Sequence, residues 1–375
     1  MDAYFLQEAL QKRKQENALR QLRPESQLID LCSNDYLGLS TNAQIQAAVK
    51  RSSLQIQDYR SGSTGSRLLT GNTTYAEALE DKIASFHQAE AALLFNSGYD
   101  ANLGLISVIA SRHDTIIYDS LSHASIIDGT RLSRAVNKIK FEHNNLEDLE
   151  KKLVQKTGNA FVIIESIYSM DGDIALLHAI SEVCKKHSAY LIVDEAHANG
   201  VFGDNGEGLV VAEKLNESVF ARILTFGKAI GAHGAVVAGS NMLKEYLINF
   251  ARPFIYTTAL PHHTLASIHA AYDYLPSATK ERKLLFENIS YFGRELHNTF
   301  PGIAVAQGPI QSILLPGNDH AKRIAALLQS KGFDIRAILS PTVEKGKERL
   351  RICIHAFNTK EQLGDVIRIL KESII

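Results

Sequence analysis

The sequence contains few of the residues that build folds held by disulfides or clustered metal ligands. It has three cysteines, eight prolines and no tryptophan among 375 residues. The cysteines, Cys32, Cys184 and Cys353, lie far apart and form no Cys-x-x-Cys pair, which argues against a disulfide framework and a cysteine-rich metal site. Each is expected to act as a small hydrophobic residue in a reducing compartment.

An excess of charge of either sign is also missing. Lysine and arginine together number 40, and aspartate and glutamate 41. This balance requires no basic face, which argues against nucleic acid and an acidic membrane surface as partners. No uncharged apolar run reaches about 18 residues, and the N-terminal residues contain no long apolar stretch. We therefore expect neither a membrane span nor a signal peptide, and we expect a cytoplasmic chain of enzyme size.

Several common catalytic motifs are absent as well. The sequence has no His-Glu-x-x-His, no Gly-x-Ser-x-Gly and no P-loop pattern, so zinc hydrolases, serine hydrolases and P-loop NTPases lose their main support. The pair His262-His263 has no partner at metal-ligand spacing, and we interpret it as part of a loop. No metal site is expected.

Short apolar runs typical of buried strands alternate with helix-length segments over much of the chain. The runs lie at residues 91–95, 115–118, 160–164, 190–193, 223–226 and 235–238. This alternation predicts an α/β fold with a mostly parallel central sheet covered by helices on both faces. In such sheets ligands bind outside the carboxyl ends of the strands.

The length of the chain exceeds what one hydrophobic core usually serves, so we expect more than one domain. Residues 1–40 should form a helix (4–22) and a short strand. Residues 41–263 should form the large domain, and residues 264–375 a smaller α+β domain with its linking helix. The small domain is expected to contain strands at 310–315, 335–339 and 350–354 and helices at 320–331 and 359–372.

Two polar residues follow buried runs in the large domain. Asp194 ends one run and Lys228 follows another, after Gly227. An aspartate at a strand end is often only a helix cap, and a loop lysine usually faces solvent. The two together resemble the site of pyridoxal-phosphate (PLP) enzymes, in which a lysine holds the cofactor covalently and an aspartate binds its ring nitrogen.

Two further segments could contact such a cofactor. Ser97-Gly98-Tyr99 follows the run at 91–95 and opens an apolar helix, whose N-terminus could bind phosphate or simply be capped by the serine. His123 follows the run at 115–118. A lone histidine is more often structural, but its imidazole also offers a flat surface to a pyridine ring.

Taken together, several ordered blocks of the sequence resemble the α-oxoamine synthases. These blocks lie at residues 33–40, 97–99, 121–125, 169–173, 194–197, 225–229 and 350–352. Members of that family are PLP-dependent acyltransferases of fold type I that condense an amino acid with an acyl-CoA and lose carbon dioxide. The resemblance implies PLP as the cofactor. It also implies an amino acid and an acyl thioester (on CoA or acyl carrier protein) as substrates, and a homodimer with shared active sites.

The resemblance assigns roles to the residues that match family positions. Lys228 would hold PLP and remove the α-proton, Asp194 would keep the proton on the ring nitrogen, and His123 would stack on the ring. His197 would hydrogen-bond to the ring hydroxyl. The other implied cofactor contacts are Gly98, Tyr99, Ser169, Thr225 and, from the neighbouring subunit, Thr258. The implied substrate-binding residues are Arg20, Asn34, Thr342 and Arg351.

Residues 250–258 most resemble the branch of the family that joins L-alanine to a pimeloyl thioester in biotin synthesis. Three sites depart from that branch: Ala198-Asn199 replaces Gly-Thr, Thr64 replaces a glycine, and Leu339-Ser340 replaces Arg-Pro. The last site lies beside the expected substrate entrance. The acyl chain, and the choice among alanine, glycine and serine, therefore stay open. From another class, a binding module that keeps the motif without catalysis is the alternative.

Overall fold

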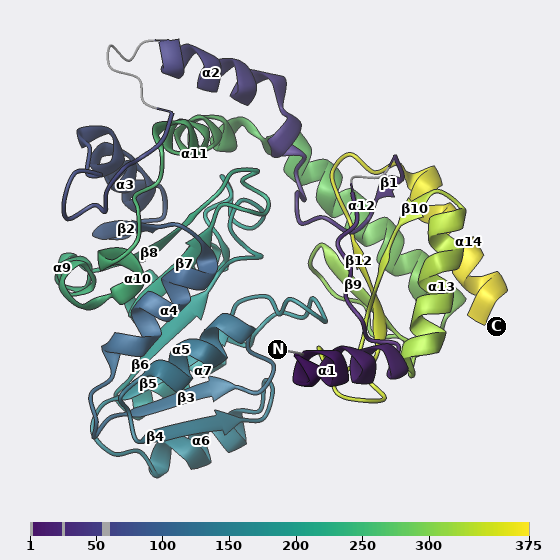
Figure 1. The fold of residues 1–375 in the computed structure, drawn as a ribbon, viewed down its shortest axis with the longest axis horizontal. Helices are drawn as coiled ribbons and strands as arrows, with labels where there is room; N and C mark the ends of the chain where they lie inside the picture. The colour runs from purple at the N-terminus through teal and green to yellow at the C-terminus, as the bar shows by residue number, and fades with distance from the viewer. Residues whose placement is uncertain (1–2, 25–26, 55–60, 375) are drawn as a thin grey trace. The chain divides into compact units, whose positions relative to one another are not determined.

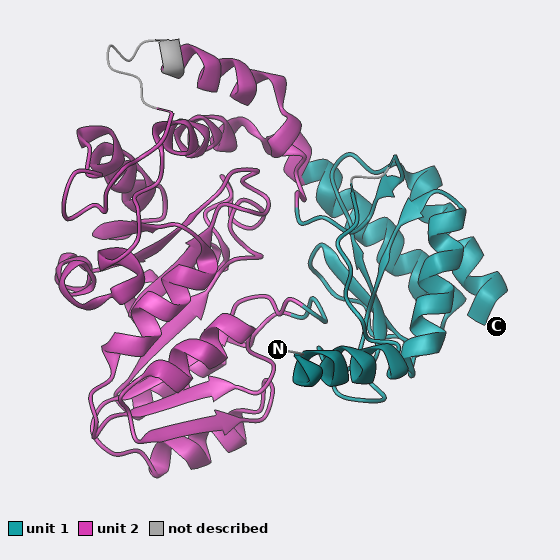
Figure 2. Ribbon diagram, in the orientation of Figure 1, with its two compact units in different colours: residues 1–34, 170–173, 283–375 teal, residues 35–169, 174–282 magenta. Residues whose placement is uncertain are grey.

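The computed structural model describes residues 3–24, 27–54 and 61–374. The chain divides into two compact units, coloured separately in Figure 2. Unit 1 comprises residues 1–34, 170–173 and 283–375, and unit 2 comprises residues 35–169 and 174–282. The N-terminal residues thus group with the C-terminal ones, and the helix expected from residue 264 groups with unit 2. The predicted division into three folding segments stays a prediction.

Unit 2 is built on a seven-stranded sheet with the order β2-β8-β7-β6-β5-β3-β4 (Figure 1). Its strands are β2 (Ala91–Phe95), β3 (Thr115–Asp119), β4 (Asn137–Phe141), β5 (Ala160–Glu165), β6 (Ala189–Asp194), β7 (Ala221–Thr225) and β8 (Ala235–Gly239). Strands β4, β3, β5, β6 and β7 are parallel to one another, whereas β8 runs antiparallel to both β7 and β2. The predicted strands and the mostly parallel sheet are confirmed.

Side chains of the central strands alternate between two hydrophobic cores. In β5, Phe161 and Ile163 belong to one core, while Val162 and Ile164 belong to the other. The alternation follows from the pleat, which sends successive side chains to opposite faces of the sheet. Both faces are therefore buried, which is why these strands read as continuous apolar runs in the sequence.

Helices cover both faces of this sheet. The first core contains residues of α4 (Gly98–Ile109), α5 (Ala124–Leu132), α9 (Asn241–Phe250) and α10 (Arg252–Ile255). The second contains residues of α6 (Leu146–Val154), α7 (Leu177–Lys186) and α8 (Leu209–Ala212). The remaining elements of unit 2 are α2 (Ala43–Leu54), α3 (Thr74–Phe86), α11 (His262–Tyr274) and the 3-10 turns η1 (Leu39–Thr41), η2 (Asn216–Ser218) and η3 (Leu275–Ser277).

Unit 1 is a smaller α+β unit. Its three-stranded antiparallel sheet has the order β11-β12-β9, and β1 pairs with β10 in parallel. The strands are β1 (Ile29–Asp30), β9 (Ile310–Leu314), β10 (Phe333–Asp334), β11 (Arg336–Ile338) and β12 (Arg349–Cys353). The helices are α1 (Tyr4–Gln15), α13 (Asn318–Ser330) and α14 (Lys360–Ile374), and α12 (Thr279–Thr299) runs from unit 2 into unit 1.

Three expectations about secondary structure are wrong in detail. His262 and His263, interpreted as part of a loop, are the first two residues of α11. The first helix ends at Gln15 rather than near residue 22, because Asn17 adopts a left-handed φ of 49° and stops the helical pattern. Strand β4 was not expected from the sequence. Lys138 and Lys140 are exposed on this edge strand, so its sequence shows polar alternation instead of a buried run.

Candidate active site

Lys228 lies just beyond the carboxyl end of β7, within reach of a buried histidine. Its Nζ is 2.9 Å from Nε2 of His197, whose Nδ1 is 2.7 Å from the hydroxyl oxygen of Tyr36. When the Lys228 amine donates to Nε2, the imidazole proton lies on Nδ1 and the Tyr36 oxygen accepts it. Tyr36 and His197 are buried, whereas the Lys228 side chain is only half-buried. The amine is therefore oriented by a fixed hydrogen-bond chain while remaining accessible.

Asp194 ends the neighbouring strand β6 and is held by two donors. One carboxylate oxygen accepts the Ala196 backbone N–H at 2.9 Å, and the other accepts Nδ2 of Asn102 at 2.7 Å. Asn102 is itself buried in α4 and also donates to the hydroxyl of Ser125. Because β6 and β7 are parallel neighbours, Asp194 and Lys228 emerge at the same edge of the sheet.

A second acid, Glu165, lies next to Asp194 at the end of β5. The two residues are register partners across the parallel pair, and one Glu165 oxygen accepts the backbone N–H of His123 at 2.6 Å. Burial raises the pKa of Glu165 to about 8, and the charge of Asp194 adds to the effect. At neutral pH Glu165 is therefore largely protonated.

His123 begins α5 as its N-cap and lies close to both central residues. Its Nδ1 accepts hydrogen bonds from the backbone N–H and the hydroxyl of Ser125. Much of the side chain is exposed, yet desolvation of the remainder lowers its pKa, with Asp194 and Lys228 acting on it in opposite directions. The imidazole is therefore within electrostatic range of Lys228 and Asp194.

The start of α4 can accommodate a phosphate. Ser97 caps this helix by accepting the Asp100 N–H, and the first-turn amides of Gly98 and Tyr99 point out of the helix start. A Cβ built on Gly98 would lie 3.4 Å from the Thr225 hydroxyl oxygen, so this hydroxyl adjoins the helix start. An anion bound by the helix would therefore also contact Thr225.

The donors and acceptors of unit 2 fit PLP. An amine for the aldehyde carbon, a carboxylate for the ring nitrogen and a helix start for the phosphate all lie at one edge of one sheet. Lys228, Asp194, His197, Gly98 and Thr225 would hold the cofactor. Ser169, expected among the cofactor contacts, lies buried beyond the end of β5.

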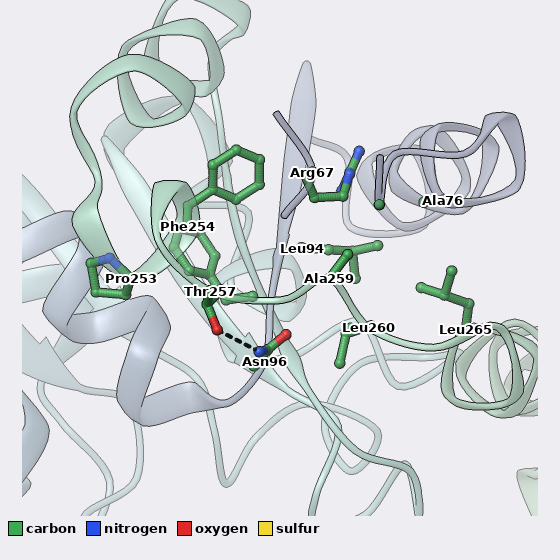
Figure 3. Close-up of a pocket in the computed structure, with 12 residues that line it drawn as sticks. Arg67, Ala76, Leu94, Asn96, Pro253, Phe254, Thr257, Ala259, Leu260 and Leu265 are labelled. Carbon is green, nitrogen blue, oxygen red and sulfur yellow. Dashed lines mark hydrogen bonds between the residues drawn. The ribbon is translucent and has the colours of Figure 1, made fainter. Parts of the chain in front are cut away.

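Thr258 lies on an exposed segment between α10 and α11. Its carbonyl accepts Nδ2 of Asn96 at 3.0 Å, and the same amide nitrogen donates to the hydroxyl of Thr257 (Figure 3). The cavity beside these residues has a volume of about 20 Å³, which suffices for about one water. Arg67 lines it and pairs with buried Glu80. This cavity is too small to be a substrate pocket.

The four predicted substrate residues belong to unit 1, where they lie in two pairs. Nη2 of Arg351 donates to Oδ1 of Asn34 at 2.9 Å, and Nη2 of Arg20 donates to the Thr342 hydroxyl at 3.0 Å. Arg351 and Asn34 are half-buried, whereas Arg20 and Thr342 are exposed. This pairing could not be predicted from the sequence, because over 300 residues separate the members of each pair.

Across residues 3–24, 27–54 and 61–374, no group of three or more histidine, cysteine, aspartate or glutamate side chains is arranged to hold a metal ion. Nor does any helix in those ranges have the length and apolar character needed to cross a membrane.

A buried group of polar side chains centred on His87 affects the stability of the folded state. Its Nδ1 contacts the Glu207 carbonyl at 2.9 Å and its Nε2 contacts the Tyr272 hydroxyl at 2.8 Å. Burial lowers the pKa of His87 to about 3, and nearby Arg222 adds to the effect. The neutral histidine is thus part of the folded state, whereas the unfolded chain takes up a proton near pH 6.5.

We expect the free energy of unfolding to fall as the pH drops below 6.5, because only the unfolded state binds this proton. With a folded pKa near 3, the loss from His87 reaches about 4 kcal/mol at pH 3. Urea unfolding of the wild type and of His87→Gln at several pH values tests this. His87→Gln should lose this part of the acid sensitivity, whereas a control at exposed His297 should retain it. Equal pH slopes for all three proteins would contradict the prediction.

Comparison with known proteins agrees with the fold. Residues 26–370 match the family model described as aminotransferase class I and II. The chain is 41% identical to the 8-amino-7-oxononanoate synthase of Emericella nidulans, over 96% of this chain and 93% of that protein. It is also 41% identical to the enzyme of the same name from Lysinibacillus sphaericus, over 91% of this chain and 87% of that one.

Solved structures show the same relationship. The chain resembles a serine palmitoyltransferase from Sphingomonas wittichii with a TM-score of 0.89 and 30% identity, covering 99% of this chain and 96% of that one. It resembles the 8-amino-7-oxononanoate synthase of Francisella tularensis with a TM-score of 0.80 and 30% identity, covering 92% and 98%. A further serine palmitoyltransferase structure, with a TM-score of 0.88, 29% identity and coverage of 99% and 97%, contains PLP.

The fold and the site thus define a PLP-dependent enzyme of fold type I. Within that class, the chain belongs to the aminotransferase class I and II family and, more narrowly, to the α-oxoamine synthases. The expectations of fold, cofactor and family are confirmed.

Sequence reasoning did not single out four residues that the structure brings to the site. These are Tyr36, Asn102, Glu165 and Asn199. Glu165 could have been found from its place at the end of a buried run, by the reasoning used for Asp194. Asn102 and Tyr36 could not have been found from the sequence, because only the folded chain brings them to Asp194 and His197.

Proposed function

We propose that the protein is an 8-amino-7-oxononanoate synthase, which condenses L-alanine with a pimeloyl thioester of CoA or acyl carrier protein. The reaction forms one carbon–carbon bond and releases carbon dioxide and the free thiol, a step of biotin biosynthesis. The observation that carries the proposal is the 41% identity, over more than 90% of this chain, to two enzymes of that name.

Bound PLP would supply an electron sink for the carbanion at the substrate α-carbon. Lys228 Nζ, oriented by His197, would take the α-proton. Asp194 would keep a proton on the ring nitrogen, and its two N–H partners hold its carboxylate in place for this. His123 would lie against the ring, and Ser169 would contact a cofactor oxygen.

Substrate binding would use the polar pairs of unit 1. Arg351, hydrogen-bonded to Asn34, presents a guanidinium suited to the carboxylate of the amino acid. Arg20 and Thr342 would contact the substrate as a second pair. A fixed carboxylate would set which bond of the α-carbon is broken first, because that choice depends on orientation.

We also propose a cytoplasmic homodimer with shared active sites, in which Thr258 contacts the phosphate bound by the partner. Unit 2 supports this with exposed apolar side chains near Thr258, among them Leu69 (81% exposed) and Tyr256 (73%). Tyr256 and Phe250 also line a groove of about 1090 Å³ beside α9 and α10. A second copy would remove this surface from water. Free cysteines fit a reducing cytoplasm.

One observation favours a second candidate function. The protein would then be a serine palmitoyltransferase or another α-oxoamine synthase, such as glycine C-acetyltransferase. The TM-score to serine palmitoyltransferase, 0.89, exceeds the 0.80 to the Francisella tularensis enzyme. The sequence identities favour the first proposal, with 41% against 30%.

One assay distinguishes the two candidate functions. The purified enzyme is incubated with alanine, glycine or serine and with pimeloyl-, acetyl- or palmitoyl-CoA, and the products are identified by mass spectrometry. The proposal expects 8-amino-7-oxononanoate from alanine and pimeloyl-CoA as the main product, and none from Lys228→Ala. A main product from serine and palmitoyl-CoA, or from glycine and acetyl-CoA, would replace it with the second candidate.

A further inference from the structure

Asn199 lies at the point where strand β6 has ended but its neighbour β7 continues. On β7, the carbonyl of Ile223 accepts the Glu195 backbone N–H at 2.8 Å. Two residues on, the Thr225 carbonyl faces the same side, because alternate residues of a strand point their backbone groups to the same neighbour. No backbone amide of β6 reaches it, since β6 ends at Asp194. Nδ2 of Asn199 donates to this carbonyl at 3.0 Å, so the side chain extends the ladder by one bond.

The orientation of the Asn199 amide is fixed from its other side. His87 Nδ1 must donate to the Glu207 carbonyl, so Nε2 is an acceptor and the Tyr272 hydroxyl donates to it. Burial raises the pKa of Tyr272, and a hydrogen bond from Asn199 acts in the opposite direction. The amide group of Asn199 therefore donates to Thr225, and its lowering effect on the Tyr272 pKa fits an N–H directed toward the phenol oxygen. Within the described residues the Oδ1 of Asn199 is buried and has no hydrogen-bond partner.

The Thr225 carbonyl is the last carbonyl of β7, which ends at Thr225 shortly before Lys228. Beyond it, the backbone turns through an exposed Gly227, and the Lys228 carbonyl accepts the Gly231 N–H at 2.8 Å. The turn returns to β7 through the Ala232 N–H, which donates to the Phe226 carbonyl. Asn199 is fully buried. A substitution of Asn199 would alter the position of Lys228 through this stretch of backbone and not through direct contact with the lysine.

We propose that Asn199 is a positioning residue that anchors the backbone of Thr225 and thereby sets the positions of the Thr225 hydroxyl and the Lys228 amine. The inference rests on the proposed function, since it assigns these two groups to the phosphate and the aldehyde carbon of PLP. It is carried by this chain's own contacts. Asn199 itself does not touch the reacting atoms.

Three variants test the proposal. Asn199→Leu keeps the approximate shape and removes both donors, and Asn199→Asp is isosteric but sets an acceptor against the Thr225 carbonyl. Tyr272→Phe is the matched control, because it removes a buried hydroxyl that is bonded to His87 and leaves the bond from Asn199 to Thr225 in place. Each protein is measured for its melting temperature, its PLP dissociation constant and the pH titration of the visible band of bound PLP. Amide hydrogen exchange of residues 226–232 is measured without PLP.

Asn199→Leu and Asn199→Asp should each bind PLP about tenfold more weakly, the effect of one lost buried hydrogen bond, and should shift the pH titration of the visible band. Exchange at 226–232 should accelerate in the free protein. Tyr272→Phe should lower the melting temperature but change PLP affinity and the titration by less than about twofold. If Asn199→Leu fails to fold, the isosteric Asn199→Asp provides the same readouts.

The proposal is overturned if the folded Asn199 variants match the wild type in PLP affinity, titration and exchange, or if Tyr272→Phe shifts PLP affinity and titration equally. This outcome differs from failure of the proposed function. That failure would be seen in the wild type itself, as a main product other than 8-amino-7-oxononanoate or as no PLP bound at Lys228, whereas here the wild type is as proposed and only the variant comparison fails.

Discussion

Replacement of Lys228 by alanine is expected to lower the rate of product formation by at least about a thousandfold and to remove the visible band of lysine-bound PLP. Alanine can neither bond to the cofactor nor accept the α-proton, and acid–base catalysis alone contributes about 10²- to 10⁴-fold. Lys228→Arg should be equally inactive. Arginine retains a positive charge near His197, but it stays protonated and cannot take a proton.

The control for this experiment is Lys151→Ala, a substitution of an exposed lysine on α6. It should retain wild-type activity and spectrum. Steady-state kinetics and absorption spectra of the three variants provide the comparison. The assignment of Lys228 fails if the alanine variant keeps more than about a tenth of the wild-type rate, because no other amine should replace an oriented catalytic lysine.

The second large effect is expected at Asp194. Asp194→Asn keeps the size of the side chain but removes the charge that would hold a proton on the ring nitrogen. We expect kcat to fall by about 10²- to 10³-fold, as for loss of one preorganised electrostatic group. The melting temperature should change little, because the amide oxygen can still accept one of the two N–H groups that Asp194 now receives.

Asp81→Asn is the matched control, since Asp81 is exposed on α3. It should behave as the wild type in the same assays. The bound cofactor supplies an independent readout, because loss of the ring proton should change the absorption spectrum of Asp194→Asn and leave that of Asp81→Asn unchanged. An Asp194→Asn enzyme with wild-type kcat would show that another group holds the ring nitrogen.

The sheet of unit 2 could be predicted because its central strands are buried on both faces. A strand such as β5 reads Ala-Phe-Val-Ile-Ile, which leaves few other structures open to it. Strand β4 lacks this signal, since one of its faces is exposed. The first helix is shorter than its sequence predicts. Its apolar residues, such as Phe5 and Leu10, are exposed, so their spacing does not reflect packing against a core.

The candidate site could be predicted as far as its residues follow strand ends. Asp194 and Thr225 end adjacent parallel strands, so topology alone brings them to one edge of the sheet. The partners that orient them could not be predicted. Asn102 contacts Asp194 from a helix 92 positions away in the sequence, and only the packing of α4 on the sheet creates the contact. Asn199 appeared in the sequence only as a departure from the related branch, and its contact with Thr225 gives it a role.

The central claim is that Lys228 is the residue that holds PLP. The most direct measurement is reduction of the PLP-loaded enzyme with borohydride, followed by proteolysis and mass spectrometry of the peptides. We predict that the visible band disappears and that the reduced cofactor is found on the peptide containing Lys228. Cofactor on a different lysine, or no cofactor on any peptide, would contradict the account.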